Sequence, residues 1–355
     1  MYDIAIVGGG PAGATLARLA GSKYKVLLLE KRSFQDDMPI TREKSCGGLL
    51  DPDAQRMMAR FGLGIPKSVL QSPQMFAVRT IDISNGVERY YQRHYININR
   101  NEFDKWLESI IPPSVTVMTD TIFRSFEDRE NHIVVRFRHK GREYNECTRI
   151  LVGADGALSA VRMQRFRECL CPKLYVTIQE WFEADKPQNY YGAIFDEEIT
   201  DFYSWTIPKE DRVILGTAMI PGKDLHNRFE LLKRKLVPYG YRFEKSLQRN
   251  GAYLYRPVKR SHILTGDGRV LLVGEAAGFI SPSSAEGMSY AFKSSLALAH
   301  ALEKGLEECE QLYRKNTNSL IRNITLKNLK SPGMYNPFLR KCAMKSGLMS
   351  IDIVD

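Results

Sequence analysis

The chain has 355 residues, which allows about two domains, and 43% of them are hydrophobic and 26% are charged. These proportions are typical of soluble globular proteins, so composition excludes wholesale disorder, a polytopic membrane protein, a collagen and a disulfide scaffold. The formal net charge is +10. Most of the excess belongs to the stretch from Gln311 to Ser350, which has no Asp or Glu and eight basic residues: Arg314, Lys315, Arg322, Lys327, Lys330, Arg340, Lys341 and Lys345.

The cysteines and histidines predict neither a disulfide framework nor a metal site. None of the six cysteines belongs to a CxxC pair, and Cys169 and Cys171 lack partner ligands, so we interpret all six as reduced thiols. The six histidines lack a ligand spacing such as HExxH. No charged and apolar leader precedes the first strand, and no window reaches the ~20 apolar residues of a spanning helix. We therefore expect a cytoplasmic protein.

The first elements in chain order form a βαβ unit. An apolar strand is predicted over residues 3–7, a small-residue helix over 11–21 and a second buried strand over 25–30. A helix follows over 101–111 and ends at Pro112-Pro113. Further strands are predicted in order over residues 115–118, 133–138 and 149–152.

The character of the sequence changes between residues 166 and 255. Aromatic-rich alternation, as in residues 203–207 and 213–217, predicts a sheet with a different role from that of the opening unit. A buried strand of the parallel type returns at residues 269–273, followed by a Gly-rich loop and a long helix that begins near Gly287. The first domain therefore resumes there.

A GxGxxG motif follows the first strand directly and opens the first helix. Gly8 permits the tight turn, Gly10 lets the backbone approach a pyrophosphate, and Gly13 lets the helix pack on the strand. Amides at the helix N-terminus then face the phosphates. Glu30 ends the next strand, 17 residues beyond Gly13, where a carboxylate accepts from both ribose hydroxyls of an adenosine and disfavours a 2′-phosphate. The motif therefore predicts FAD or NAD, bound by Gly8, Gly10, Pro11, Ala12, Gly13, Glu30 and Lys31.

Two distant segments favour FAD over NAD. The segment GADGALSAVR, which contains Asp155, follows a strand, and GRVLLVGEAAG places a second acid, Glu275, after another strand. Glu275 is positioned to hold the ribityl hydroxyls of a flavin, a second grip that NAD does not need. The stretch from Pro282 to Ala291 aims a helix N-terminus at the flavin ring, where it stabilises the anion that develops on reduction. The residues predicted to bind FAD here are Asp155, Gly274, Glu275, Gly278, Gly287 and Met288.

Over most of residues 1–300 the chain resembles the flavoprotein superfamily that includes p-hydroxybenzoate hydroxylase and the geranylgeranyl reductases. The resemblance rests on the GxGxxG with Glu30, on GADGALSAVR, on GEAAGFISPSSAEG and on the run from Asn97 to Arg100 that leads into Phe103-Asp104. It implies a Rossmann-type FAD-binding domain in which Arg100 lies against the FAD. The family's usual third-motif Asp is Glu275 in this chain, which adds one methylene and keeps the chemistry.

Two further motifs resemble the geranylgeranyl reductase branch. The run KSCGGLL at residues 44–50 is similar to that family's KxCGG loop, which implies that Cys46, Gly47 and Gly48 lie beside the reactive flavin face. The run YSWTIPK at residues 203–209 is similar to the family's YxWxxPK motif, which implies substrate contacts for Tyr203, Trp205 and Pro208. The residues from Ser45 to Arg56, with YININR and GEAAGFIS, are similar to the bacterial CbrA proteins within this group.

The resemblance implies an FAD-dependent oxidoreductase that reduces a carbon-carbon double bond of a prenyl or polyprenyl lipid by hydride transfer from flavin N5. Cys46 is our candidate for the acid that protonates the second carbon, with Tyr203 behind it. One alternative is an aromatic hydroxylase on the same scaffold. The other is a flavin electron-transfer or accessory protein. No second GxGxxG follows a strand, so electrons come from NAD(P)H that docks without its own Rossmann domain, or from a protein such as ferredoxin.

The expected architecture is α/β, with a Rossmann-type FAD-binding domain, an inserted antiparallel β-sheet substrate domain and a basic helical C-terminal segment. The FAD-binding domain takes residues 1–72, 96–163 and 262–305. The substrate domain takes residues 73–95 and 164–261, and the C-terminal segment takes residues 306–355.

The acid-free C-terminal segment has three interpretations: a solvated basic helix, a nucleic-acid site or a membrane-surface segment. It contains no recognisable nucleic-acid reader motif and few aromatic residues for base stacking, so we expect no nucleic-acid partner. Basic residues interleaved with apolar ones are the pattern expected at an anionic membrane surface. We therefore expect peripheral contact with the inner face of the membrane through Leu320, Ile324, Leu329, Phe338 and Leu348 and their basic neighbours.

Overall fold

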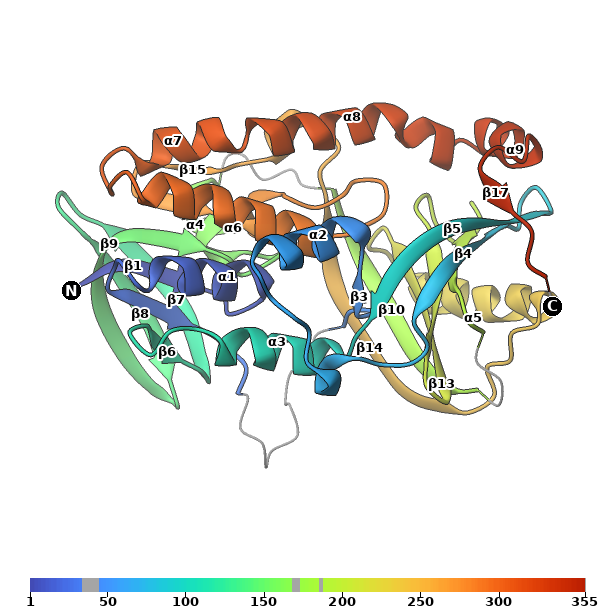
Figure 1. Cartoon of the computed structure of the whole chain (residues 1–355), viewed down its shortest axis with the longest axis horizontal. Helices are drawn as coiled ribbons and strands as arrows, with labels where there is room; N and C mark the ends of the chain where they lie inside the picture. Colours follow the sequence, from blue (N-terminus) through green and yellow to red (C-terminus); the bar gives the residue numbers. More distant parts are fainter. Residues whose placement is uncertain (34–44, 168–172, 185–187, 355) are drawn as a thin grey trace. The chain divides into compact units, whose positions relative to one another are not determined.

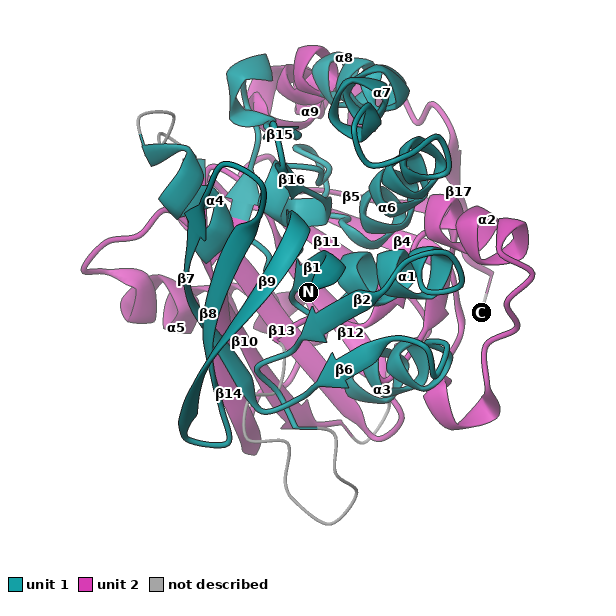
Figure 2. Ribbon diagram, turned by 90° about the vertical axis from the view of Figure 1, so that its left-hand side faces the viewer, with its two compact units in different colours: residues 1–43, 101–173, 255–327 teal, residues 44–100, 174–254, 328–355 magenta. Residues whose placement is uncertain are grey.

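A computed structural model describes residues 1–33, 45–167, 173–184 and 188–354, which form two compact units (Figure 2). Unit 1 comprises residues 1–43, 101–173 and 255–327, and unit 2 comprises residues 44–100, 174–254 and 328–355. The predicted domains are defined by the ligand that each binds, whereas the two units are defined by packing alone. The division into an FAD-binding domain and a substrate domain therefore stays a prediction. Lys44 of the KxCGG motif and the pair Cys169 and Cys171 lie outside the described residues.

Unit 1 is built on an eight-stranded sheet in the order β15-β16-β9-β1-β2-β6, with β7 and β8 attached through β9. The strands β1, β2, β6, β9 and β16 are parallel neighbours, and β7, β8 and β9 form an antiparallel meander. Their bounds are β1 Tyr2–Val7, β2 Val26–Leu29, β6 Thr116–Met118, β7 Thr121–Asp128, β8 Ile133–His139, β9 Arg142–Gly153, β15 Gly266–Asp267 and β16 Val270–Leu272.

The apolar runs of the sequence give the buried centre of this sheet. All four residues of β2 and all three of β16 are buried, which is typical of parallel strands covered on both faces. β9 is longer than its apolar part predicts, because its polar first half pairs with β8 and only its second half pairs with β1. The predicted α/β class and the predicted opening βαβ unit are confirmed.

The helices of unit 1 pack through small side chains. α1 packs against α6, and α6 packs against α7 (Figure 1). Ala12, Ala14 and Ala17 of α1 are buried, and Ser295 of α6 donates to the carbonyl of Ala12 at 2.7 Å. The bounds are α1 Pro11–Ala20, α3 Arg100–Ser109, α4 Ala160–Arg165, η4 Arg260–His262, η5 Gly274–Ala277, α6 Met288–Leu302 and α7 Cys309–Asn316. α8 spans Asn318–Tyr335 and crosses from the residues of unit 1 to those of unit 2.

Unit 2 is built on a nine-stranded sheet in the order β14-β10-β13-β12-β11-β4-β5-β17, with β3 paired to β5. Most neighbours are antiparallel, as predicted, but β11 and β4 are parallel. The strand bounds are β3 Leu49–Leu50, β4 Met75–Asp82, β5 Val87–Asn97, β10 Lys173–Glu183, β11 Tyr191–Phe195, β12 Ser204–Lys209, β13 Arg212–Met219, β14 Ser246–Arg256 and β17 Ser350–Ile351.

One face of this sheet is covered by α5. The helix buries Phe229, Leu232 and Leu236 in a core cluster with Ile194 of β11 and Leu215 of β13. The helical elements of unit 2 are α2 Pro52–Arg60, η1 Lys67–Val69, α5 Leu225–Leu236, η3 Val237–Tyr239 and α9 Pro337–Lys345. Within the described residues, no helix combines the length and hydropathy that a membrane span requires.

A buried arginine attaches α9 to the sheet of unit 2. Arg340 is only 4% exposed, and its guanidinium contacts both carboxylate oxygens of Asp82 at 2.7 and 3.0 Å. It also donates to Glu197 at 2.6 Å and lies 4.9 Å from the centre of the Phe195 ring. Arg340 is one of the eight basic residues of the C-terminal segment, and it is a structural cation rather than a surface charge.

The substitution Arg340→Met tests this attachment. Asp82 is fully buried, and removing the cation that faces it leaves a charge without its main compensation. We expect the free energy of unfolding to fall by about 3–5 kcal/mol, measured by urea denaturation at neutral pH. Arg56→Met is the control, because Arg56 pairs with Asp53 at the surface and its loss costs less than about 1 kcal/mol. Equal effects of the two substitutions would refute the anchoring role.

Candidate cofactor and proton-transfer sites

The predicted site residues of unit 1 gather where its parallel strands end. Val7 of β1, Leu29 of β2, Gly153 of β9 and Leu272 of β16 lie in one row across the sheet. One residue further on, three backbone hydrogen bonds continue the row: Gly8 N–H to Leu29 O at 2.8 Å, Ala154 N–H to Val7 O at 2.8 Å, and Val273 N–H to Gly153 O at 3.0 Å. The turns that follow β1, β9 and β16 therefore start side by side, although they are far apart in the sequence.

The glycines of the first turn are needed for different reasons. A Cβ on Gly8, which has a φ of +104°, would lie 2.5 Å from the carbonyl oxygen of Ala154, and a Cβ on Gly13 would lie 1.8 Å from the carbonyl oxygen of Gly8. Both positions are closed by the protein itself. A Cβ on Gly10 would meet no atom of the described residues within 4 Å. Gly10 precedes Pro11 and Ala12 at the N-terminus of α1, so the open space lies where helix amides attract a phosphate.

Glu30 ties β2 to the first turn. Its Oε2 atom accepts from the amide of Gly9 at 2.7 Å, and its Oε1 atom accepts from the amide and Nε of Arg32 at 2.9 and 3.0 Å. Arg32 also donates to Asp104 of α3 at 2.6 Å. The carboxylate predicted to hold a ribose thus also fixes the turn beside it, while its neighbour Lys31 is exposed. Nη2 of Arg32 also donates to Oε2 at 3.4 Å, so four donors face the about four acceptor positions of the carboxylate, and a ribose hydroxyl would replace this longest contact.

Asp155 begins the second turn and caps α4. Its Oδ2 atom accepts from the amides of Ala160 and Val161 at 2.7 and 3.4 Å. Its Oδ1 atom is buried and, within the described part of the chain, has no hydrogen-bond partner. Burial raises the pKa of Asp155, against the opposing effect of its hydrogen bonds. A buried polar atom without a partner is costly unless a ligand supplies one, so Asp155 fits a role in binding a polar cofactor group.

Glu275 and the third turn lie beside the second. A Cβ on Gly156 would be 3.9 Å from Oε2 of Glu275, and Oε1 of Glu275 accepts from the amide of Tyr255 at 3.0 Å. Gly274 and Gly278 take positive φ values of 59° and 86°, which makes a tight 3-10 turn before the chain reaches α6. α6 begins at Met288, directly after Gly287, as the sequence predicts.

Three side chains that sequence reasoning did not select hold the three turns together. Ser294 of α6 accepts from the amide of Gly274 at 2.9 Å. Its neighbour Ser295 donates to the carbonyl of Ala12 at 2.7 Å. Arg162 of α4 donates to the carbonyl of Ala276 at 3.1 Å. Arg162 is the last residue of the GADGALSAVR motif, so its place in the motif could have identified it. Nothing in the sequence distinguishes Ser294 and Ser295 from the other small residues of their helix.

The predicted site residues of unit 2 form a second set around Cys46. Nη1 of Arg100 lies 3.3 Å from the Cys46 Sγ atom, so a guanidinium faces the thiol. The loop packs directly against β12, because a Cβ on Gly47 would lie 2.2 Å from the Cδ1 atom of Ile207. Gly48 has a φ of +64°, and its carbonyl accepts from the amide of Ile98 at 2.9 Å. The KxCGG-like and YININR motifs therefore meet in three dimensions.

Lys209 joins these motifs to the third one, and sequence reasoning missed it. The side chain is 2% exposed, and its ammonium donates to the carbonyls of Ile98 and Gly48 at 2.8 and 3.2 Å and to Oδ1 of Asn97 at 2.5 Å. Burial lowers the pKa of Lys209 to about 7, and the nearby ionisable groups of Cys46 and Glu210 oppose that shift. Lys209 is the last residue of the YSWTIPK run, so its place in the motif could have identified it as a site residue.

The remaining motif residues lie on β12 or, in the case of Tyr203, directly before it. Tyr203 and Trp205 are each 7% exposed, with ring centres 5.6 Å apart. The Tyr203 hydroxyl lies 3.4 Å from that of Tyr191, and a Cβ on Gly216 would lie 2.3 Å from the Trp205 ring. Pro208 is buried, and its carbonyl accepts from Asn97 at 2.8 Å. The aromatic residues therefore form a packed apolar surface, and Pro208 contributes backbone to the network around Lys209.

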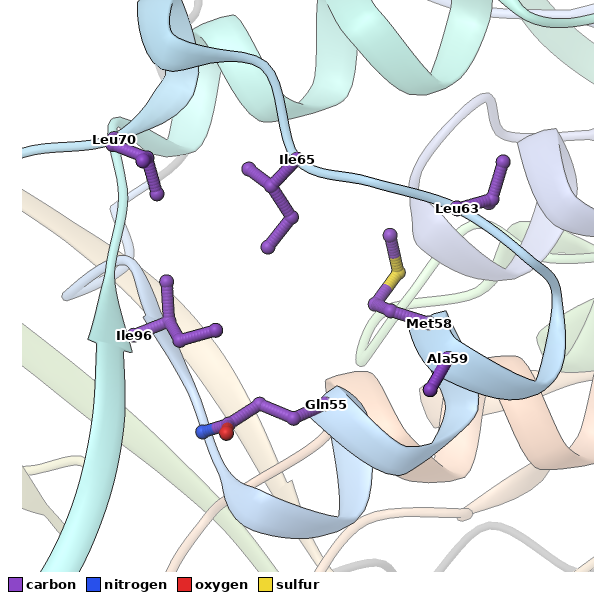
Figure 3. A pocket seen from close by; sticks show the side chains of 7 residues that line it. All are labelled: Gln55, Met58, Ala59, Leu63, Ile65, Leu70 and Ile96. Atoms are coloured by element: carbon purple, nitrogen blue, oxygen red, sulfur yellow. The ribbon is translucent and has the colours of Figure 1, made fainter.

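An apolar pocket of about 340 Å³ also lies in unit 2 (Figure 3). Its lining residues are Gln55, Met58, Ala59, Leu63, Ile65, Leu70 and Ile96. The amide nitrogen of Gln55, the one polar side chain of the lining, already donates to the carbonyls of Leu50 and His94 at 2.9 and 3.2 Å. The pocket includes none of the predicted site residues.

Comparison with known proteins agrees with this geometry. Residues 1–173 match the family described as FAD binding domain. The chain is 42% identical over 352 residues to Protein CbrA of Escherichia coli O6:H1, covering 99% of this chain and 94% of that protein. It shares its fold with a geranylgeranyl bacteriochlorophyll reductase-like protein from Thermoplasma acidophilum (TM-score 0.81, 19% identity, 97% and 90% of the two chains). It also shares its fold with PqsL, a probable FAD-dependent monooxygenase from Pseudomonas aeruginosa (TM-score 0.70, 17% identity, 98% and 99%).

The cofactor is FAD, and the unit 1 residues fit it. The space beside Gly10 at the start of α1 suits the pyrophosphate, and the acceptors of Glu30, Asp155 and Glu275 suit the hydroxyls of its ribose and ribityl groups. The contribution of each of these residues to binding stays a prediction.

The substitution Gly10→Ala separates cofactor approach from folding. The added methyl group meets no described protein atom, so the variant should fold and unfold like the parent, while it obstructs the phosphates. We expect FAD affinity to fall at least about tenfold in a fluorescence titration of the apoprotein. Gly64→Ala is the matched control, because its Cβ also meets nothing within 4 Å. Unchanged FAD affinity in Gly10→Ala would show that the phosphates lie elsewhere.

Lys209 predicts a pH dependence of stability in the apoprotein. Between pH 7 and about 10.5 the unfolded chain binds more protons at this lysine than the folded chain, so the free energy of unfolding should rise with pH. The rise from this one group is at most about 1.4 kcal/mol per pH unit. Lys209→Met should remove it. Urea denaturation at pH 7.5, 8.5 and 9.5 measures both slopes, and parallel slopes in parent and variant would contradict the burial effect.

Proposed function

We propose that this chain, which belongs to the family of the CbrA proteins and is an FAD-dependent oxidoreductase, reduces a carbon-carbon double bond of a prenyl or polyprenyl lipid. The observation that carries the proposal is the contact between Arg100 and the Cys46 thiol, at 3.3 Å. It provides an acid next to a cation within a network of buried motif residues. The fold likeness of this chain to the geranylgeranyl reductase-like protein of Thermoplasma acidophilum also supports the proposed reductase activity.

Saturation of an alkene needs a hydride on one carbon and a proton on the other. FAD held by the three turns of unit 1 would supply the hydride when it is reduced. We assign the proton to the Cys46 thiol, which leaves a thiolate after the transfer. The guanidinium of Arg100 stabilises that thiolate, because a neighbouring cation favours the deprotonated form of a cysteine. The Tyr203 hydroxyl, 3.4 Å from that of Tyr191, is the second candidate for the proton donor.

Lys209 is a positioning residue in this proposal. Its ammonium holds the carbonyl of Gly48, two residues after Cys46, and the carbonyl of Ile98, two residues before Arg100. The donor and its cation are therefore fixed by one buried side chain. Orientation matters here because an unactivated alkene has no carbonyl oxygen that the protein could stabilise electrostatically.

Two aromatic residues at the start of β12 support the proposed substrate class. Tyr203 and Trp205 present rings and no charge, which suits an isoprenoid chain better than an ionised metabolite. The two electrons of each cycle come from a reduced nicotinamide or from an electron-donor protein such as ferredoxin. The protein is proposed to act in the cytoplasm.

The second candidate is an aromatic hydroxylase, and the fold likeness to PqsL, a probable FAD-dependent monooxygenase, supports monooxygenase chemistry on this scaffold. If this chain is a hydroxylase, it would consume oxygen when a phenol is added, whereas the proposed reductase works without oxygen. An electron-transfer or accessory protein, in contrast, would be reoxidised by a quinone or a partner protein and would not respond to an alkene.

Anaerobic photoreduction of the purified holoprotein, followed by titration with prenyl lipids and with phenols, tests the proposal. We expect the absorbance of oxidised flavin to return when a prenyl lipid is added and the lipid to gain two hydrogens in mass spectrometry. Reoxidation only by oxygen with a phenol would establish the hydroxylase, and reoxidation only by a quinone would establish the electron carrier.

Substitution of Cys46 by Ala or Ser tests the proton donor. We expect FAD binding to be unchanged and lipid-dependent reoxidation to slow by about 10²-fold, the usual contribution of a general acid. Cys147→Ala is the matched control, because that thiol is also half-buried but lies on β9 of unit 1. Full activity in both Cys46 variants would remove this residue from the mechanism and leave Tyr203 as the candidate.

A further inference from the structure

The C-terminal part of unit 2 has one face that is fixed to the protein and one that is not. On α9, Arg340 and Met344 are 4% and 3% exposed. Arg89 donates to the carbonyl of Met344 at 3.1 Å, and Asn85 donates to the carbonyl of Pro337 at 3.1 Å. Residues 340 and 344 are one helical turn apart, so these contacts fix the rotation of α9 on the sheet.

The opposite face of α9 is apolar and exposed. Phe338 is 71% exposed and lies across the helix from Arg340, and Leu339, 46% exposed, lies on the flank between them. The chain then continues through Leu348 and Met349, which are 75% and 82% exposed, into β17, where Ser350 and Ile351 pair with β5. The sequence-based expectation is wrong for Leu320 and Ile324, which are buried at 9% and 1% exposure. We call Phe338, Leu339, Leu348 and Met349 the C-terminal apolar surface.

Such exposure is concentrated in this part of the chain. Among the residues that the structure describes, 21 large apolar side chains are exposed, and ten of them lie between Leu326 and Val354. Scattered exposed apolar residues need no explanation, but a concentration of them indicates a surface that meets an apolar partner.

The charges within the segment from Gln311 to Ile351 are of one sign, and the first acid after it is the exposed Asp352. Lys330 and Lys345 are exposed and Lys341 is half-buried, and no acidic residue occurs between Gln311 and Ile351. The acids that α9 does touch, Asp82 and Glu197, are already paired with Arg340. The surface therefore offers lysine ammonium groups and apolar side chains without competing carboxylates in its own segment.

We propose that the C-terminal apolar surface, with Lys330, Lys341 and Lys345, binds the surface of an anionic lipid bilayer. Apolar side chains enter the boundary between headgroups and acyl chains, and lysines at the same surface pair with anionic headgroups. This partner fits because it supplies both an apolar layer and a dense negative charge. The inference does not depend on the proposed reaction, since it concerns binding alone.

The test is flotation of the FAD-loaded full chain with vesicles of phosphatidylcholine, with and without 30% phosphatidylglycerol. We expect binding to the anionic vesicles, weaker binding at 0.5 M NaCl and little binding to phosphatidylcholine alone. The double variants Phe338→Ser/Leu348→Ser and Lys341→Glu/Lys345→Glu should each reduce the partition coefficient at least about tenfold. Point variants are preferable to a truncation, because a truncation would also remove Arg340 from buried Asp82.

Ile220→Ser/Lys223→Glu is the matched control, because it changes one exposed apolar and one exposed basic residue outside this segment. It should float like the parent, and all variants should keep the FAD content and thermal unfolding of the parent. Equal flotation of the Phe338→Ser/Leu348→Ser variant, or no flotation of the parent, would overturn the proposal. A dimer in light scattering that Phe338→Ser/Leu348→Ser dissociates would instead identify a second copy of the chain as the partner, which also overturns it.

Discussion

Everything proposed for the cofactor depends on one row of backbone hydrogen bonds at the end of the parallel sheet in unit 1. The amides of Gly8, Ala154 and Val273 each donate to the neighbouring strand within 2.8 to 3.0 Å, so three turns separated by more than 100 residues begin at the same level. The space beside Gly10, the buried oxygen of Asp155 and the carboxylate of Glu275 are consequences of that register. A slip of one strand would separate them, because the turns can be adjacent only while the strands end together.

A different constraint organises unit 2. Three motifs meet at a single buried ammonium, that of Lys209, which holds backbone carbonyls of the cysteine loop and of the segment before Arg100. Burying a lysine is costly, and the depressed pKa of Lys209 shows that cost. We interpret the arrangement as one that holds a thiol and a guanidinium in fixed positions for proton transfer, so that the energetic cost of burial serves the precision of the site.

The sequence alone was sufficient for the elements with strong local signals. Apolar runs predicted β1, β2 and β16, and the glycine spacing predicted the turn and helix that follow β1. The resemblance motifs also identified which acids and glycines would come together. Long-range pairings were beyond this reasoning. In the sequence, Arg340 is one of several basic residues in an acid-free tail. Only the fold brings it to Asp82, which is 258 residues away along the chain. Ser294 and Ser295 read as helix residues, and their partners belong to two other segments.

The central claim is that one FAD molecule contacts all three turns of unit 1, and hydrogen exchange of backbone amides tests it most directly. The exchange of the apoprotein is compared with that of the FAD-loaded protein by mass spectrometry. We expect slower exchange with FAD in three separate peptides, covering residues 8–16, 154–162 and 274–290. Protection confined to the first peptide would contradict the account, because it would mean that the cofactor is held by the GxGxxG turn alone.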